Sequence, residues 1–210
     1  NVYFLLDFQP LTLSILLYPM WIPTYGMALF CFASYQIHLP ITLVYAGFIV
    51  GGTFVLTTLI PLSILLIAIH RGKVSDLQIS NATERTMPYL YTAICYAFWP
   101  FLLRIIEVPF FLRLVAIGAF VALCIVMFIN IHWKISAHLT GLGGLIGGIL
   151  AFQLYYGIIP SNSLIISLFM IALALMYARL WLRAHTDWQV IAGFCLGLTA
   201  TALPTYIALL

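Results

Sequence analysis

The chain has 210 residues, of which 65% are hydrophobic and only 6% are charged, and its formal net charge is +3. Ordinary globular domains carry roughly 25% charged residues, so the composition excludes a water-soluble domain, a disordered chain and a disulfide scaffold. The small net charge also argues against nucleic acid as a partner. The composition predicts an integral membrane protein.

Seven apolar segments follow one another along the chain. A spanning helix needs about 20 mostly apolar residues, and the backbone must satisfy its own hydrogen bonds in lipid, which favours helices. The charged residues are clustered and leave long uncharged stretches, such as the one from Asp7 to Arg71. The segments are roughly 11–35, 41–69, 87–103, 109–131, 138–157, 161–180 and 188–209. We expect a single-domain, all-α, polytopic transmembrane bundle of about six or seven spans.

Prolines interrupt the first two segments. Pro19 and Pro23 lie in the first, and Pro61 lies in the second. Because proline removes a backbone hydrogen bond inside a helix, we expect kinks there that neighbouring helices tolerate.

Three polar loops, 70–86, 132–137 and 181–187, are each separated by two apolar segments. Two crossings return the chain to the starting side, so all three loops are predicted on one membrane face. That face collects Arg71, Lys73, Arg85, Lys134, Arg179 and Arg183, together with His70, His132, His138 and His185. The positive-inside rule is one explanation for the basic residues. Because neutral histidine carries no such signal, an anion site at this face is the alternative.

The loop 132–137 leads directly into a glycine-rich helix. Ser136 and His138 stand at its start, where a helix offers unpaired N–H groups and a positive dipole end to an anion. His138 can also exchange a proton near pH 7. The glycines of 141–148 do not form a P-loop, because no Gly-Lys-Ser/Thr follows them. Their small size favours close packing against another helix.

The loop 181–187 follows two arginines that share a helix face, Arg179 and Arg183. They are either snorkelling cations at the end of a membrane helix or ligands of an anion. Arg179 and His185 can meet at one ligand only if the helix ends between them. Thr186 or Asp187 is then expected to cap the next helix.

Two of these patterns resemble motifs of the type 2 phosphatidic acid phosphatase (PAP2) superfamily. Ser136-Ala137-His138 is similar to that family's Pro-Ser-Gly-His motif. Arg179, five intervening residues and His185 are similar to its third motif, Ser-Arg-x5-His-x3-Asp. The order and the two intervening helices agree, and the resemblance covers about the last two-thirds of the chain.

The chain also departs from the family pattern. Gln189 stands where the third motif has its aspartate. The first motif, Lys-x6-Arg-Pro, has its nearest counterparts in Lys73 and Arg85, which are more widely spaced.

The resemblance implies a membrane phosphatase that needs no metal or other cofactor and acts on a lipid phosphate or isoprenyl (di)phosphate. His185 would be the nucleophile that forms a phosphohistidine, and His138 would protonate the leaving oxygen. Gln189, four residues after His185, would accept the Nδ1–H of that imidazole. The groups expected to bind the phosphoryl oxygens are Arg179, Ser136, Arg85 and Lys73.

Two other interpretations remain open. One is a PAP2-like protein with impaired catalysis that binds or moves an anionic lipid. The other is a bis-histidine haem protein that uses two of His70, His132, His138 and His185. Analogy favours a bacterial inner membrane, while the side that the site faces and the oligomeric state stay open.

Overall fold

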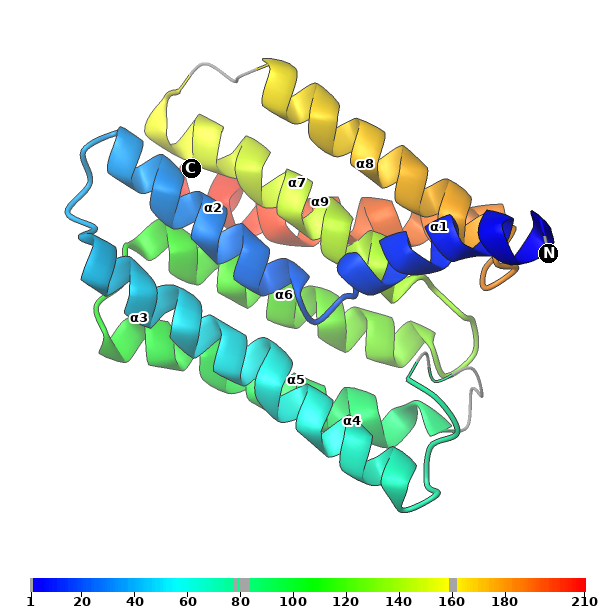
Figure 1. Cartoon of the computed structure of the whole chain (residues 1–210). Helices are drawn as coiled ribbons and strands as arrows, with labels where there is room; N and C mark the ends of the chain where they lie inside the picture. Colours follow the sequence, from blue (N-terminus) through cyan, green and yellow to red (C-terminus); the bar gives the residue numbers. More distant parts are fainter. Residues whose placement is uncertain (1, 78, 80–83, 159–161) are drawn as a thin grey trace.

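The protein is all-helical throughout the residues that the computed structural model describes, which are 2–77, 79, 84–158 and 162–210. Its elements are α1 (Val2–Leu16), α2 (Ile22–Gln36), α3 (Leu43–Phe54), the π-helical η1 (Val55–Leu59), α4 (Ile60–His70), α5 (Thr86–Ile105), α6 (Phe110–Ile129), α7 (Ala137–Tyr156), α8 (Asn162–Trp181) and α9 (Asp187–Ala208). The long helices lie side by side along one axis (Figure 1). The prediction of an all-α bundle is confirmed.

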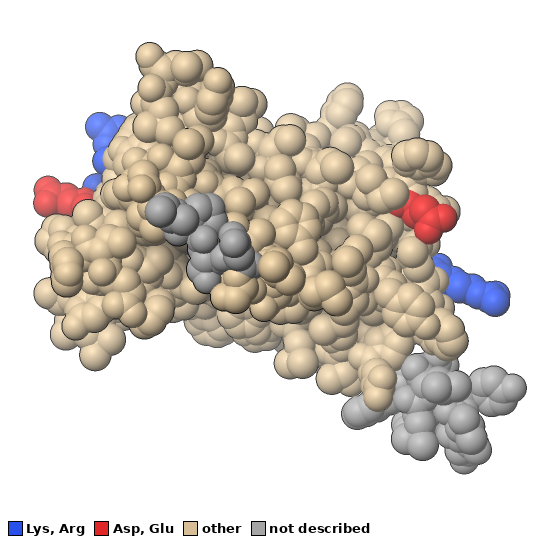
Figure 2. All heavy atoms as spheres, turned by 90° about the horizontal axis from the view of Figure 1, so that it is seen from above, with Lys and Arg blue, Asp and Glu red and all other residues tan. Residues whose placement is uncertain are grey.

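Within the described residues, five helices are long and apolar enough to cross a membrane, which supports a multi-pass membrane protein. They are Leu43–His70 (α3, η1 and α4 in one run), Phe110–Ile129, Ala137–Tyr156, Ser163–Trp181 and Asp187–Ala208. The helices α1, α2 and α5 lie outside this set. In the view of Figure 2, the charged side chains gather at the two ends of the molecule and uncharged residues cover the surface between them.

The first predicted segment, 11–35, is not one helix. The structure divides it into α1 and α2, with residues 17–21 between them. Pro19 lies in this break, where it has no N–H to continue the helical ladder. Pro23 stands in the first turn of α2, where the missing N–H costs nothing. The second segment, by contrast, continues through Pro61, with η1 directly before it.

Glycines bring α7 and α9 into close backbone contact. At four positions an added Cβ would overlap a backbone carbonyl oxygen across the α7–α9 contact, and these positions are Gly143, Gly147, Gly193 and Gly197. Small residues allow this approach in membrane helices. We call this contact the glycine seam. The packing role expected for the glycine run is thus confirmed, and the seam brings the N-terminal ends of α7 and α9 together.

Candidate functional site

The three polar loops meet at one end of the bundle (Figure 1), as expected from counting the crossings. A cavity of about 450 Å³ opens there. Each loop contributes to its wall, with Arg85 from the first, Lys134 from the second and His185 from the third. The site therefore combines residues that are 100 positions apart in the sequence.

The charged part of the cavity wall is cationic. Arg85, Lys134, Arg179 and Arg183 line it, and within the described ranges no Asp or Glu does. Burial, Arg85 and Arg179 lower the pKa of Lys134, against the opposing effect of Asp76. Such a concentration of positive charge attracts an anion.

Arg179 occupies the last turn of α8 and is only 4% exposed. Its Nε and Nη1 atoms are buried and have no hydrogen-bond partner among the described residues. A buried cation without partners is costly, so these atoms are the groups that a bound anion would satisfy. Arg85 is held differently, because its Nε donates to the Ile79 carbonyl (2.8 Å) and its Nη1 to Asn130 Oδ1 (3.4 Å).

His185 lies in the turn between α8 and α9, where the chain leaves one helix and enters the next. As expected, α8 ends between Arg179 and His185, and Thr186 caps α9. The Nδ1 atom of His185 is 3.1 Å from the Lys134 carbonyl oxygen. A carbonyl only accepts hydrogen bonds, so Nδ1 carries the proton and Nε2 keeps its lone pair.

The pKa of His185 is lowered to about 4. Burial is the main cause, and the nearby charge of Arg179 adds to it, while hydrogen bonds to the Lys134 carbonyl and to Gln189 act in the opposite direction. The imidazole is therefore neutral at pH 7, as a nucleophile must be.

Gln189 does not lie one continuous helical turn after His185, because α9 begins at Asp187. Its Oε1 accepts the backbone N–H of Thr186 (3.1 Å) in a capping box. Gln189 was expected to accept the Nδ1–H of His185, but the Lys134 carbonyl lies 3.1 Å from Nδ1 and accepts it. Gln189 is an additional neighbour of the ring.

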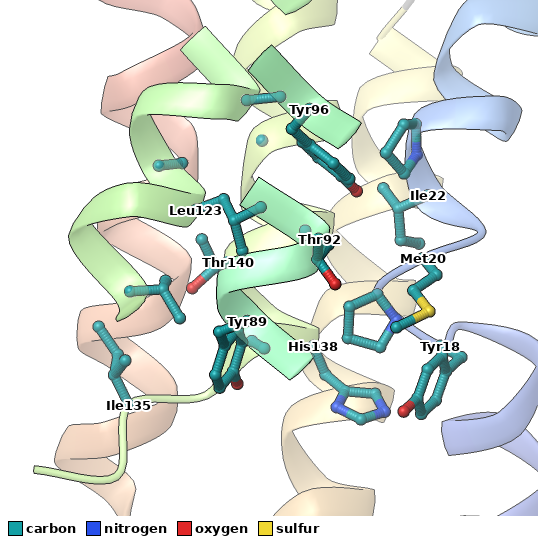
Figure 3. A pocket seen from close by; sticks show the side chains of 18 of the residues that line it. Tyr18, Met20, Ile22, Tyr89, Thr92, Tyr96, Leu123, Ile135, His138 and Thr140 are labelled. Atoms are coloured by element: carbon teal, nitrogen blue, oxygen red, sulfur yellow. The ribbon is translucent and has the colours of Figure 1, made fainter. Parts of the chain in front are cut away.

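His138 lies in the first turn of α7 and lines the cavity beside Tyr18 (Figure 3). Its Nε2 donates to the backbone carbonyl of Ser14 in α1 (3.2 Å). The ring stands edge-on to Tyr18, with 5.5 Å between the centroids. Arg179 is close enough to interact electrostatically with both His138 and His185.

Two residues expected to bind phosphate are placed elsewhere. Ser136 is fully buried and caps α7, with its Oγ accepting from the Leu139 N–H at 3.5 Å. Lys73 is exposed, and neither residue lines the cavity. Four of the expected site residues, His138, Arg179, His185 and Arg85, do share the cavity.

Three further cavity residues, Tyr18, Asn130 and Lys134, were not among the expected site residues, although Lys134 was placed on the cationic face. Tyr18 donates from its hydroxyl to the Leu77 carbonyl (2.5 Å) and so joins the α1–α2 break to the first loop. The available signal was position alone, because Asn130 closely precedes the loop 132–137 and Lys134 lies within it. Their residue types alone did not assign them to the cavity wall.

Over the described part of the chain, no three His, Cys, Asp or Glu side chains lie close enough together to hold a metal ion. His70 and His132 are exposed and do not line the cavity, so of the four histidines considered for haem, His138 and His185 are the ones that share it.

A scan against protein-family models and searches of curated proteins and of solved structures found no match to this chain. The interpretation of the site therefore depends on its own geometry and on the sequence motifs.

Proposed function

We propose that this chain is a membrane phosphatase that hydrolyses a lipid phosphate or isoprenyl (di)phosphate through a phosphohistidine formed on His185. The observation that carries the proposal is the pairing of two groups: the Arg179 guanidinium, whose buried Nε and Nη1 have no hydrogen-bond partner among the described residues, and the nearby neutral imidazole of His185, whose Nε2 keeps its lone pair. The motif resemblance to the PAP2 superfamily supports the same reading. A bacterial inner membrane and six or seven spans belong to this proposal as well.

Phosphoryl transfer depends mainly on positioning and on stabilising the charge of the phosphoryl oxygens. Arg179, Arg85 and Lys134 supply that positive charge at the cavity wall. The Nε2 lone pair of His185 attacks phosphorus as the bond to the lipid oxygen breaks, and that oxygen takes a proton from the imidazolium form of His138. Water then attacks the phosphohistidine and passes a proton back to His138, which releases inorganic phosphate and restores both histidines to their starting forms.

A second candidate is a protein that binds or moves an anionic lipid without hydrolysing it. The uncharged side chain of Gln189 favours this candidate, because it cannot stabilise a cationic phosphohistidine as a carboxylate would. Both candidates use the same anion site and differ in whether His185 reacts.

Phosphate release from a panel of lipid phosphates and isoprenyl diphosphates tests the proposal. We expect release by the purified protein in the presence of a chelator, loss of release in His185→Ala, and unchanged release in His132→Ala, which alters an exposed histidine outside the cavity. If orthovanadate binds but no substrate is hydrolysed, the phosphatase proposal is wrong, and the protein is the second candidate, which binds or moves an anionic lipid.

A further inference from the structure

The cavity extends from its charged end far into the helix bundle. Its wall runs from Pro88 to Trp99 along α5 and from Val126 to Val115 along α6, a separation of eleven positions in each helix. At 1.5 Å per residue this corresponds to a depth of about 16 Å. In Figure 3, His138 and Tyr18 mark one end and Tyr96 lies deeper.

The hydroxyl groups of the threonines in the deeper wall already form hydrogen bonds to backbone carbonyls of the protein. Thr92 donates to the Pro88 carbonyl (2.8 Å), and Thr140 donates to the carbonyl of Ser136 (2.9 Å). Thr201 is likewise bonded, since its hydroxyl is 2.8 Å from the Gly144 carbonyl oxygen.

Trp99 is also satisfied within the protein, because its Nε1 donates to Thr53 Oγ1 (2.9 Å). Phe30, Leu123 and Val126 add purely apolar surface to the same wall. The deep part thus suits hydrocarbon, whereas the mouth carries the cations.

We propose that this deep part encloses a single hydrocarbon chain of the ligand inside the bundle, between α2, α5, α6 and α7. The proposal rests on the proposed function for the phosphate group and adds the class of substrate: a single-chain amphiphile with a terminal phosphate or diphosphate. A linear alkyl chain and a short isoprenoid chain share this chemistry.

The dimensions set an upper limit on the chain. An extended hydrocarbon chain advances roughly 1.25 Å per carbon, given bonds of about 1.5 Å at tetrahedral angles. A depth of about 16 Å then accepts about 12 carbons. The volume of about 450 Å³ must hold the phosphate group as well, so a second chain is left outside the enclosed space.

The test measures binding of n-alkylphosphonates, which cannot be hydrolysed, to the full chain held in lipid nanodiscs. Methyl, butyl, octyl and dodecyl members are compared with didodecyl phosphate, which has two chains. The variant Ala122→Phe places a ring in the deep part of the cavity. Residue 122 is eight positions, or about 12 Å, along α6 from Asn130 at the charged end. Ala97→Phe is the matched control, because Ala97 is exposed on α5 and does not line the cavity.

We expect wild-type affinity to rise from methyl to octyl, by up to about fourfold for each fully buried methylene. Ala122→Phe should keep methylphosphonate and butylphosphonate binding, which also shows that it folds, and weaken dodecylphosphonate at least tenfold. Ala97→Phe should match wild type throughout, and didodecyl phosphate should bind more weakly than dodecylphosphonate.

Equal affinity for methylphosphonate and octylphosphonate would overturn the enclosed chain while leaving the anion site intact. An equal loss of dodecylphosphonate affinity in both phenylalanine variants would overturn it too, because the chain would then lie in the bilayer. If no member of the series binds, the anion site and the enclosed chain both fail. Because the readout is binding, these outcomes do not depend on phosphatase activity.

Discussion

The Nδ1–H of His185 donates to the backbone carbonyl of Lys134, across 51 positions of sequence and at 3.1 Å. This bond joins the loop before α7 to the loop before α9. Because the acceptor belongs to the backbone, no side-chain substitution removes it directly. The fold therefore fixes the tautomer of His185. Gln189 is not needed to set this tautomer, and its effect on the reaction can be tested independently.

Replacing Gln189→Glu should accelerate phosphate release. A glutamate retains the oxygen that accepts the Thr186 N–H, and it adds a negative charge beside His185 that stabilises the cationic phosphohistidine. We expect a rise in kcat of roughly threefold to tenfold. Gln189→Ala serves as the control, which should remain active because Lys134 still fixes the ring. A Gln189→Glu variant that is slower than wild type at equal thermal stability contradicts this role.

The lowered pKa of His185 makes stability depend on pH. The unfolded imidazole has a pKa of about 6.5, whereas the folded one titrates near 4. As the pH falls through this window, the unfolded chain binds a proton that the folded chain does not, so stability is lost on acidification. The thermal midpoint of wild type should fall more steeply between pH 6.5 and 4 than that of His185→Gln. Parallel curves for the two proteins would show that burial does not perturb this imidazole.

Removing the guanidinium of Arg179, whose Nε and Nη1 have no partner among the described residues, should abolish anion binding. Orthovanadate should raise the thermal midpoint of wild type, because a ligand of the native state stabilises it by about 2.7 kcal/mol at a hundredfold excess over Kd. Arg179→Ala should lose this shift. Arg104→Ala, which alters an exposed arginine in the last turn of α5, should retain it. Retention of the full shift in Arg179→Ala would mean that Arg179 is a structural cation.

Ser136 should matter for stability and not for anion binding. Its hydroxyl caps α7, and loss of an N-cap costs about 0.5–2 kcal/mol. Ser136→Ala should therefore lower the thermal midpoint while the orthovanadate shift stays as in wild type. Ser136→Asn, which can still cap the helix, should recover most of the loss. Disappearance of the orthovanadate shift in Ser136→Ala would restore the phosphate-binding role implied by the motif.

The glycine seam should tolerate no side chain. A Cβ on Gly197 would overlap the Thr140 carbonyl oxygen, so Gly197→Ala should destabilise the protein by about 1–3 kcal/mol. Gly51→Ala is the matched control, because its Cβ meets nothing within 4 Å and alanine is the better helix former. The measurement is the unfolding midpoint in detergent. Equal midpoints for both variants would show that α7 and α9 separate at little cost.

Composition and loop spacing were sufficient to predict the helical class and the meeting of the three loops. Both follow from local rules: lipid demands helices, and two crossings return the chain to the same side. The histidines and Arg179 were found because their residue types carry chemistry. The first segment was predicted as one helix because proline can either kink or break a helix, and packing decides between them.

Other site features depend on tertiary structure in a way that residue types do not encode. Ser136 can point its hydroxyl to a ligand or to its own helix, and the backbone conformation at the cap decides. The Lys134 carbonyl is a group that every residue possesses, so only the fold reveals that it faces His185. Arg85 and Lys73 are chemically similar in the sequence, yet one is buried in the cavity wall and the other is exposed.

The glycine seam has a mechanical consequence for the two histidines. His138 is in the first turn of α7, His185 directly precedes α9, and the Ser136 N–H donates to the Gln189 carbonyl (3.1 Å) where these two helices begin. Because the helices interlock through their backbones, a tilt or vertical shift of one carries the other with it. We therefore expect the two imidazoles to move together when the thickness or lateral pressure of the bilayer changes. The distance between His138 and His185 then stays the same.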